Sequence, residues 1–262
     1  MIKTVKGLVL RSIRYGESDK LITALTEEGI VFFKARGIRS ITSKNAAGCA
    51  AFVYSEFMLD QRGDKCYLRK ALPLYSTIRA GASLGALALA SYFAELSEDT
   101  ARDAETGKAV LRLLMNALYL LSKEDRPEAI IKSVFEIRLL AVNGLMPQIE
   151  ECSVCQNETE VCDTLYFRLM DGDLVCGSCK NEEDSNLLRV SKDVVDLCRH
   201  SIESTEEKAY SIRVPERLQK EFSRLTEQFL LHQLDRNYKT LDFYKEIGSK
   251  EQENYGVKNE SI

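Results

Sequence analysis

Apolar and polar residues alternate through much of the first 72 residues, which is the pattern of half-buried β-strands. The alternation predicts five short strands, at residues 5–13, 20–26, 30–36, 51–59 and 66–72. Glu27, Glu28 and Gly29 separate the second strand from the third and predict a hairpin loop. Five strands in about 80 residues is the strand number of a small Greek-key barrel such as the OB-fold.

The spacing of apolar residues becomes helical after Pro73. Residues 83–98 are rich in alanine and leucine, and a second helix carries an apolar stripe along one face. The stripe consists of Val110, Leu114, Ala117, Leu118 and Leu121. A third helix is predicted to begin at Pro127 and to end before Gly144 and Pro147. Because this helix is apolar over a wide arc, we expect it to be central.

Two further helices are predicted towards the C-terminus. Ser191 is placed to cap a helix at 192–202, and Pro215 opens the last helix. The inward positions of that last helix are Leu218, Phe222, Leu225 and Phe229. Beyond residue 247 the chain is polar, so we expect a disordered tail at 248–262.

Four of the eight cysteines form two CxxC pairs separated by 20 residues. The pairs are Cys152 with Cys155 and Cys176 with Cys179. Each pair turns two thiolates towards one point, so four thiolates complete a tetrahedral site for one structural Zn²⁺ ion per chain. Reduced structural cysteines and a redox dithiol are the alternatives. The other four cysteines lack this spacing and are assigned to the core or to free thiols.

A catalytic zinc ion usually keeps an open position for water, and four cysteine ligands leave none. The two histidines, His200 and His232, lie in predicted helices. A nuclease or zinc hydrolase is therefore disfavoured. The predicted architecture is an α+β multidomain chain with an N-terminal OB-fold β-barrel at 1–80 and an α-helical domain at 81–247. The zinc ribbon is inserted in the helical domain at about 148–186.

The net charge of −4 hides an asymmetry along the chain. Residues 1–80 hold 14 Lys and Arg against 7 Asp and Glu, and the remainder holds 22 against 33. A basic loop at 34–44 leaves the third strand. These features point to nucleic acid or another polyanion at the barrel, with a solvated basic face as the alternative. Residues 150–186 hold ten acidic residues against two basic ones, so phosphate contact there is disfavoured.

The N-terminal residues and the longest uncharged stretch indicate where in the cell the protein is found. The first 20 residues mix charged and apolar residues without the apolar core of a signal peptide. The longest uncharged stretch, 80–94, is too short for a membrane-spanning helix. We therefore expect a cytoplasmic protein without a membrane partner.

Several motifs together resemble one family. They are Gly7-Leu-Val-Leu10, Tyr15-Gly-Glu-Ser-Asp-Lys-Leu21, Leu25-Thr-Glu-Glu-Gly29, Lys34-Ala-Arg-Gly-Ile-Arg39 and Asn143-Gly-Leu-Met-Pro147 followed by the two CxxC pairs. Over about residues 1–245 the chain resembles RecO, the family of bacterial recombination mediators. The resemblance implies sequence-independent binding of single- and double-stranded DNA, annealing of complementary strands and association with the nucleoid. It also implies that, with RecR, the chain helps to load RecA onto strands coated by single-strand-binding protein (SSB), without nucleotide hydrolysis.

The resemblance also assigns roles to residues. Matched to the family's basic loop, the DNA-binding candidates are Lys34, Arg36, Arg39 and Lys44, with Arg11 and Arg14 next. Candidates for contact with the acidic and apolar C-terminal tail of SSB are Arg112, Lys132 and Arg138. Without the resemblance, charge and fold equally allow an RNA-binding OB-fold factor with a structural zinc ribbon.

Overall fold

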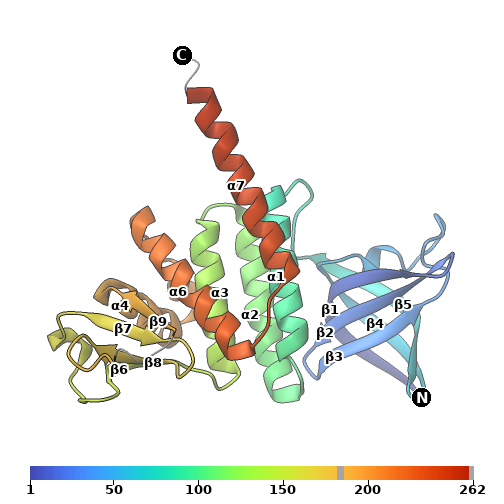
Figure 1. Ribbon diagram of the computed structural model, residues 1–262. Helices are drawn as coiled ribbons and strands as arrows, with labels where there is room; N and C mark the ends of the chain where they lie inside the picture. Colours follow the sequence, from blue (N-terminus) through green and yellow to red (C-terminus); the bar gives the residue numbers. More distant parts are fainter. Residues whose placement is uncertain (182–185, 260–262) are drawn as a thin grey trace. The chain divides into compact units, whose positions relative to one another are not determined.

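The computed structural model describes the backbone of residues 1–181 and 186–259, and the side chains of these residues up to residue 249. Contacts divide the chain into two compact units (Figure 1). The first unit comprises Met1–Asp125 and the C-terminal segment from Tyr238, and the second is Arg126–Asn237. No helix among the described residues is both long and apolar enough to cross a bilayer.

The five predicted strands are confirmed and close into a barrel in the order β1-β2-β3-β5-β4. Their bounds are β1 (Ile2–Tyr15), β2 (Asp19–Thr26), β3 (Gly29–Ala35), β4 (Val53–Arg62) and β5 (Lys65–Ser76). All pairings are antiparallel except that of β3 with β5. Five strands closed in this way make an OB-like barrel, as the alternation predicted.

Every second side chain along the strands points into the barrel and fills it. Val9, Ile22, Phe33 and Phe57 point inwards and are at most 3% exposed. The long strand β1 serves two neighbours, because its first half pairs with β4 and its second half with β2. An irregularity in the register with β2 near Val9 accompanies this change of partner.

Within the described residues, three α-helices belong to the barrel's unit. They are α1 (Leu84–Thr100), α2 (Ala104–Lys123) and α7 (Lys239–Asn259). Ser83 caps α1, and Asp103 forms a capping box with Thr106 at the start of α2. The first turn of α2 rests on the β2–β3 hairpin, where a Cβ atom on Gly107 would lie 2.5 Å from the backbone nitrogen of Gly29. Glycine at 107 therefore permits this close approach.

The prediction that the Pro215 helix is the last one is wrong, because α7 follows it. The Tyr238 ring lies 5.9 Å from the Tyr92 ring, and the hydroxyl of Thr240 donates to Glu95 over 2.6 Å. These contacts pack α7 on α1. The backbone of α7 is helical to Asn259, which includes most of the tail that we expected to be disordered; residues 260–262 of that tail lie outside the described residues.

The second unit combines helices with a small sheet. Its helices are α3 (Glu128–Val142), α4 (Lys192–Glu203), α5 (Glu206–Ala209) and α6 (Glu216–Leu234). As predicted, α3 is central, with contacts to α4 and α6. Ser191 caps α4, and Pro127 and Pro215 stand at the caps of α3 and α6. The change from strands to helices, predicted near residue 80, falls between β5 and α1, although the first compact unit continues to Asp125.

The sheet of the second unit has the order β6-β8-β7-β9. Its strands are β6 (Gln148–Cys152), β7 (Leu165–Arg168), β8 (Asp173–Cys176) and β9 (Leu187–Val190). Between the two CxxC pairs, β7 and β8 form the antiparallel ribbon that the sequence predicted. Because β6 and β8 lie side by side and each ends in a cysteine, their ends bring the two pairs together.

Candidate nucleic-acid interface and metal centre

Two of the predicted DNA-binding residues, Arg11 and Lys34, lie on the outer face of β1, β2 and β3, and three more lie in the loop that follows β3: Arg36, Arg39 and Lys44. Ile13 pairs with Leu21, Leu21 with Lys34, and Lys34 with Tyr67 of β5. Paired residues of neighbouring strands share a face, so these four side chains form one row across the barrel. One step further along the strands, Tyr15 pairs with Asp19. We call this surface, with the basic loop at 34–44, the basic face.

Cations on the basic face lie against aromatic rings. The ammonium nitrogen of Lys34 is 4.3 Å from the centroid of the Tyr15 ring. The guanidinium of Arg36 is 4.6 Å from the centroid of the Tyr67 ring, and that of Arg62 is 5.8 Å from it. Such pairs hold long basic side chains flat along the sheet. The face therefore offers positive charge beside exposed rings.

Apolar side chains are exposed between these cations. Tyr15 is 50% exposed and Phe32 is 60% exposed. Ile13 and Leu21, which are 48% and 41% exposed, lie beside them. Tyr75 of β5 is 49% exposed as well. Most other rings of the barrel are buried or partly buried, since they fill it.

The remaining predicted DNA-binding residues differ in how they are held. Arg39 is exposed and donates to the carbonyl oxygen of Glu17 over 2.6 Å. Lys44 and Arg14 are exposed. Arg11 is paired with Glu98 of α1 over 2.6 Å, which offsets its charge. The sequence reasoning missed Asp19 and Tyr67, although the alternation of β5 could have placed Tyr67 outside the barrel.

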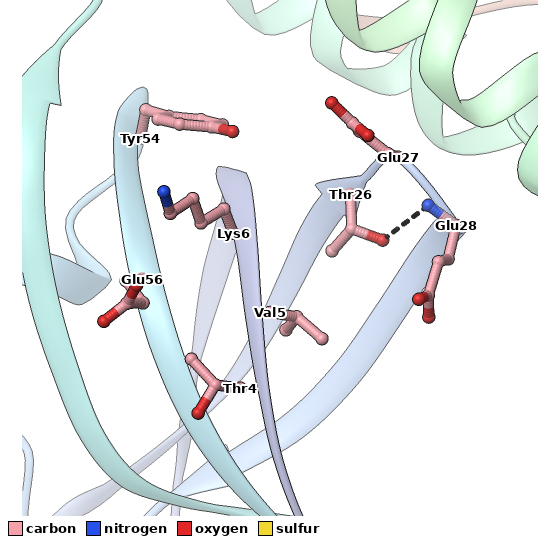
Figure 2. Close-up of a pocket in the computed structure, with 8 residues that line it drawn as sticks. All are labelled: Thr4, Val5, Lys6, Thr26, Glu27, Glu28, Tyr54 and Glu56. Atoms are coloured by element: carbon pink, nitrogen blue, oxygen red, sulfur yellow. Dashed lines mark hydrogen bonds between the residues drawn. The ribbon is translucent and has the colours of Figure 1, made fainter.

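A cavity of about 360 Å³ lies elsewhere on the barrel surface (Figure 2). Its lining includes Lys6 and the carboxylates of Glu27, Glu28 and Glu56. Burial, followed by the charges of neighbouring groups, raises the pKa of Tyr54 at the same cavity. Three carboxylates against one ammonium make the cavity net negative, so it does not extend the basic face.

The second candidate site lies in the sheet of the other unit. The sulfur atoms of Cys152, Cys155, Cys176 and Cys179 all lie within 4.8 Å of one another. Those of Cys155 and Cys176 are 3.9 Å apart. Cys152 and Cys176 are buried, and Cys155 is exposed. The structure thus brings together the four residues that the spacing predicted, and they can hold a metal ion.

The pKa values of Cys152 and Cys179 bear on whether the cluster can bind a cation. Burial opposes ionisation of Cys152, but backbone N–H groups of residues 155, 176 and 154 donate to its sulfur and lower its pKa to about 6. In contrast, hydrogen bonds from Cys179 to the sulfurs of Cys176 and Cys155 raise the pKa of Cys179 to about 12. Ionising all four thiols together therefore needs a positive ion among them.

The backbone of the second CxxC pair requires glycine at position 177, directly after Cys176. A Cβ atom on Gly177 would lie 2.0 Å from the hydroxyl oxygen of Thr164, so no side chain fits there. The N–H groups of Cys179 and Lys180 both donate to the carbonyl oxygen of Cys176, each over 3.0 Å. These bonds turn the chain so that Cys176 and Cys179 face the same point.

The three candidates for contact with the SSB tail are divided between the two units and differ in exposure. Arg112 is exposed on α2, in the first unit, whereas Lys132 and Arg138 lie on α3, in the second. Lys132 is 2% exposed, and its ammonium pairs with Glu136 and Glu227, each over 2.9 Å. Arg138 donates to the carbonyl oxygen of Ser204. Lys132 is therefore part of the core and not of the surface, because two carboxylates stabilise its buried charge.

Together, the fold and the sites define an OB-type barrel protein with a cysteine-rich metal ribbon. Residues 1–75 match the profile of the family described as Recombination protein O N terminal, and residues 82–242 match that of Recombination protein O C terminal. The chain belongs to the Recombination protein O (RecO) family.

Curated relatives agree over almost the whole chain. A DNA repair protein RecO of Acetivibrio thermocellus is 28% identical over 242 residues, covering 92% of this chain and 95% of that protein. The DNA repair protein RecO of Caldicellulosiruptor saccharolyticus is 28% identical, covering 92% and 97%. That of Alkaliphilus metalliredigens is 27% identical, covering 94% and 100%.

Proposed function

We propose that this protein is a recombinational DNA-repair mediator that binds single- and double-stranded DNA without sequence preference and anneals complementary strands. With RecR, it helps to load RecA onto SSB-coated single strands. Membership of the RecO family and the names of the relatives support the repair role. The observation that carries DNA binding is the basic face, where cations and exposed rings alternate on one side of the barrel.

The basic face has the two elements that single strands need. Arg36, Arg39 and Lys44 supply positive charge for phosphates, and such contacts carry no sequence information. Tyr15 and Phe32 supply exposed rings, on which any base can stack. A surface of this kind holds strands in register without selecting a sequence, which suits annealing.

DNA contact is expected to be confined to the barrel. The segment 150–186 has a net charge of −8, from ten acidic and two basic residues, before any thiolate is counted. Phosphates are repelled by such a segment, more strongly at low salt. The ribbon therefore supports the fold or a protein contact.

The metal is assigned as zinc with a structural role. In a tetrahedral site with Zn–S bonds of about 2.3 Å, sulfur atoms lie about 3.8 Å apart. The 3.9 Å between Cys155 and Cys176 fits this geometry. Four cysteines fill the coordination sphere, which leaves no position for a reacting water. We accordingly propose a non-enzymatic protein.

Strand annealing without ATP tests the function directly. Complementary oligonucleotides, bare or coated with SSB, are mixed with the protein, and duplex formation is followed by fluorescence. We expect faster annealing of both. Acceleration of bare strands alone would support DNA binding without the SSB contact. No acceleration, together with preference for RNA over matched DNA in competition, would favour an RNA-binding factor.

Replacing both Arg36 and Arg39 with alanine is expected to weaken binding to all DNA sequences alike, by about tenfold or more. The slope of log affinity against log salt should fall by about one to two, because up to two phosphate contacts are lost. Fluorescence anisotropy at several salt concentrations measures both quantities. A matched control, Arg189→Ala with Lys220→Ala, removes the same charge from exposed positions of the second unit. Equal losses in the two variants would contradict the assigned face.

A further inference from the structure

Asp19, the first residue of β2, holds the start of the basic loop through its side chain. The carboxylate of Asp19 accepts a hydrogen bond from the backbone N–H of Gly37 over 2.8 Å. Its other oxygen pairs with the ammonium of Lys34 over 2.9 Å. One carboxylate thus binds both Lys34, the penultimate residue of β3, and Gly37 in the loop that follows the strand.

Backbone atoms of the turn between β1 and β2 hold the next part of the loop. The carbonyl oxygen of Ser18 accepts from the backbone N–H of Arg39 over 3.0 Å. The guanidinium of Arg39 donates to the carbonyl oxygens of Glu17 and Gly16, over 2.6 and 3.4 Å. Residues 16–19 therefore bind the segment from Lys34 to Arg39 on its polar side, while Ile38 within it is buried in the barrel core.

Beyond Arg39 the loop has mainly local support. The N–H of Ser40 donates to the carbonyl oxygen of Gly37, and that of Ser43 to the carbonyl oxygen of Ser40. Ile41, between these turns, is fully exposed. The far end of this outer part is held again at Asn45, whose side-chain oxygen accepts from the backbone N–H of Ala71 over 2.9 Å.

We propose that Asp19 is a positioning residue for DNA binding: its carboxylate fixes the base of the basic loop, so it strengthens DNA binding although it is negatively charged. This inference rests on the proposed function. An ordered loop loses less conformational freedom when phosphates bind it, which raises affinity without a new contact.

Charge and positioning predict opposite results at this residue. If Asp19 acted only through its charge, its removal would free Lys34 and strengthen the attraction for phosphates. If Asp19 acts by holding the loop, its removal weakens binding. The hydrogen bond from Lys34, with that from Gly37, lowers the pKa of Asp19 to about 2, so the carboxylate is ionised at neutral pH.

Asp19→Ala and Glu17→Ala separate the two effects. Glu17 lies in the adjacent turn and is exposed, and its carboxylate forms no ion pair within the described part of the chain. We expect Asp19→Ala to weaken binding to a single-stranded oligonucleotide by about 5- to 20-fold, through loss of loop order. Glu17→Ala should leave affinity unchanged or up to about threefold tighter, because only a negative charge is lost.

Asp19→Asn provides a conservative rescue. Its amide oxygen can still accept from Gly37, whereas the ion pair with Lys34 is lost. Its affinity should therefore lie between those of the wild type and Asp19→Ala. Hydrogen exchange of the Gly37 amide, measured without DNA, should speed up most in Asp19→Ala, at a melting temperature close to that of the wild type.

The outcomes are distinct. Tighter DNA binding by both alanine variants would overturn the positioning role and leave only the charge effect. Slow exchange at Gly37 in Asp19→Ala would overturn it as well, whatever the affinity. If the wild type binds no DNA, the proposed function fails, while the exchange measurement still shows whether Asp19 holds the loop.

Discussion

Replacing Cys176 with serine is expected to abolish metal binding and to destabilise the second unit strongly. Cys176 ends β8 and is 6% exposed, and its sulfur lies 3.9 Å from that of Cys155. A structural zinc ion contributes its binding free energy to folding, about 10–16 kcal/mol in small zinc modules at neutral pH. Removing one of four thiolates loses much of this contribution. Metal content measured by mass spectrometry should fall from about one ion per chain to near zero.

Thermal unfolding and DNA binding complete this test. The variant should melt at a lower temperature, and the wild type treated with a strong chelator should behave like it. Cys66→Ser is a matched control, because Cys66 is a half-buried thiol of the barrel outside the cluster. DNA affinity per folded molecule should change little, since the basic face lies in the other unit. A metal-free Cys176→Ser protein with undiminished stability would refute the structural role.

Replacing Lys132 with alanine is expected to cost about 3–5 kcal/mol of unfolding free energy, because it leaves two carboxylates facing each other without their cation. The ammonium of Lys132 lies 2.9 Å from both Glu136 and Glu227, and Glu136 is fully buried. The hydroxyl of Thr226 also donates to Glu136 over 2.7 Å. Urea unfolding at pH 7 to 8 measures the loss. A loss of less than about 1 kcal/mol of unfolding free energy, which is typical of an exposed ion pair, would contradict a buried cluster.

The unfolding free energy of Lys132→Ala should also depend on pH in a way that differs from the wild type. Burial raises the pKa of Glu136, while Lys132 lowers it. A carboxyl whose pKa is higher in the folded state adds stability below its unfolded pKa, and this stability is lost as pH rises through the folded value. Without Lys132 the folded pKa rises further. The deficit of Lys132→Ala against the wild type should therefore grow from about pH 4 to pH 8.

A double variant separates the effect of the buried Lys132–Glu136 ion pair on stability from the effect of packing around it. Lys132→Met with Glu136→Leu removes a buried cation and a buried anion together. Because an unpaired buried charge costs more than an absent pair, this protein should be more stable than Lys132→Ala. If the double variant is less stable than the single one, packing and not charge governs this position.

Local patterns in the chain were enough to predict the five barrel strands, most helices and the cluster of four cysteines. Alternation predicted the five barrel strands because each strand is half-buried and its side chains alternate between the two faces. Caps such as Ser191 and Pro215 marked helix starts because they serve local backbone geometry. The CxxC spacing predicted the cysteine cluster because one tight turn already brings two sulfurs together. Each of these signals spans only a few residues.

Other features depended on residues far apart in the chain. The last helix, α7, has a mostly polar sequence and is held by contacts of Tyr238 and Thr240 with α1. Lys132 reads as a surface cation, yet Glu227, 95 residues later, joins Glu136 in pairing with it inside the unit. In the sequence, Asp19 is one acidic residue in a basic region, but in the structure its carboxylate accepts a hydrogen bond from the N–H of Gly37 in the loop. The burial and pairing of a charge depend on which distant segments pack around it, and no local pattern carries that information.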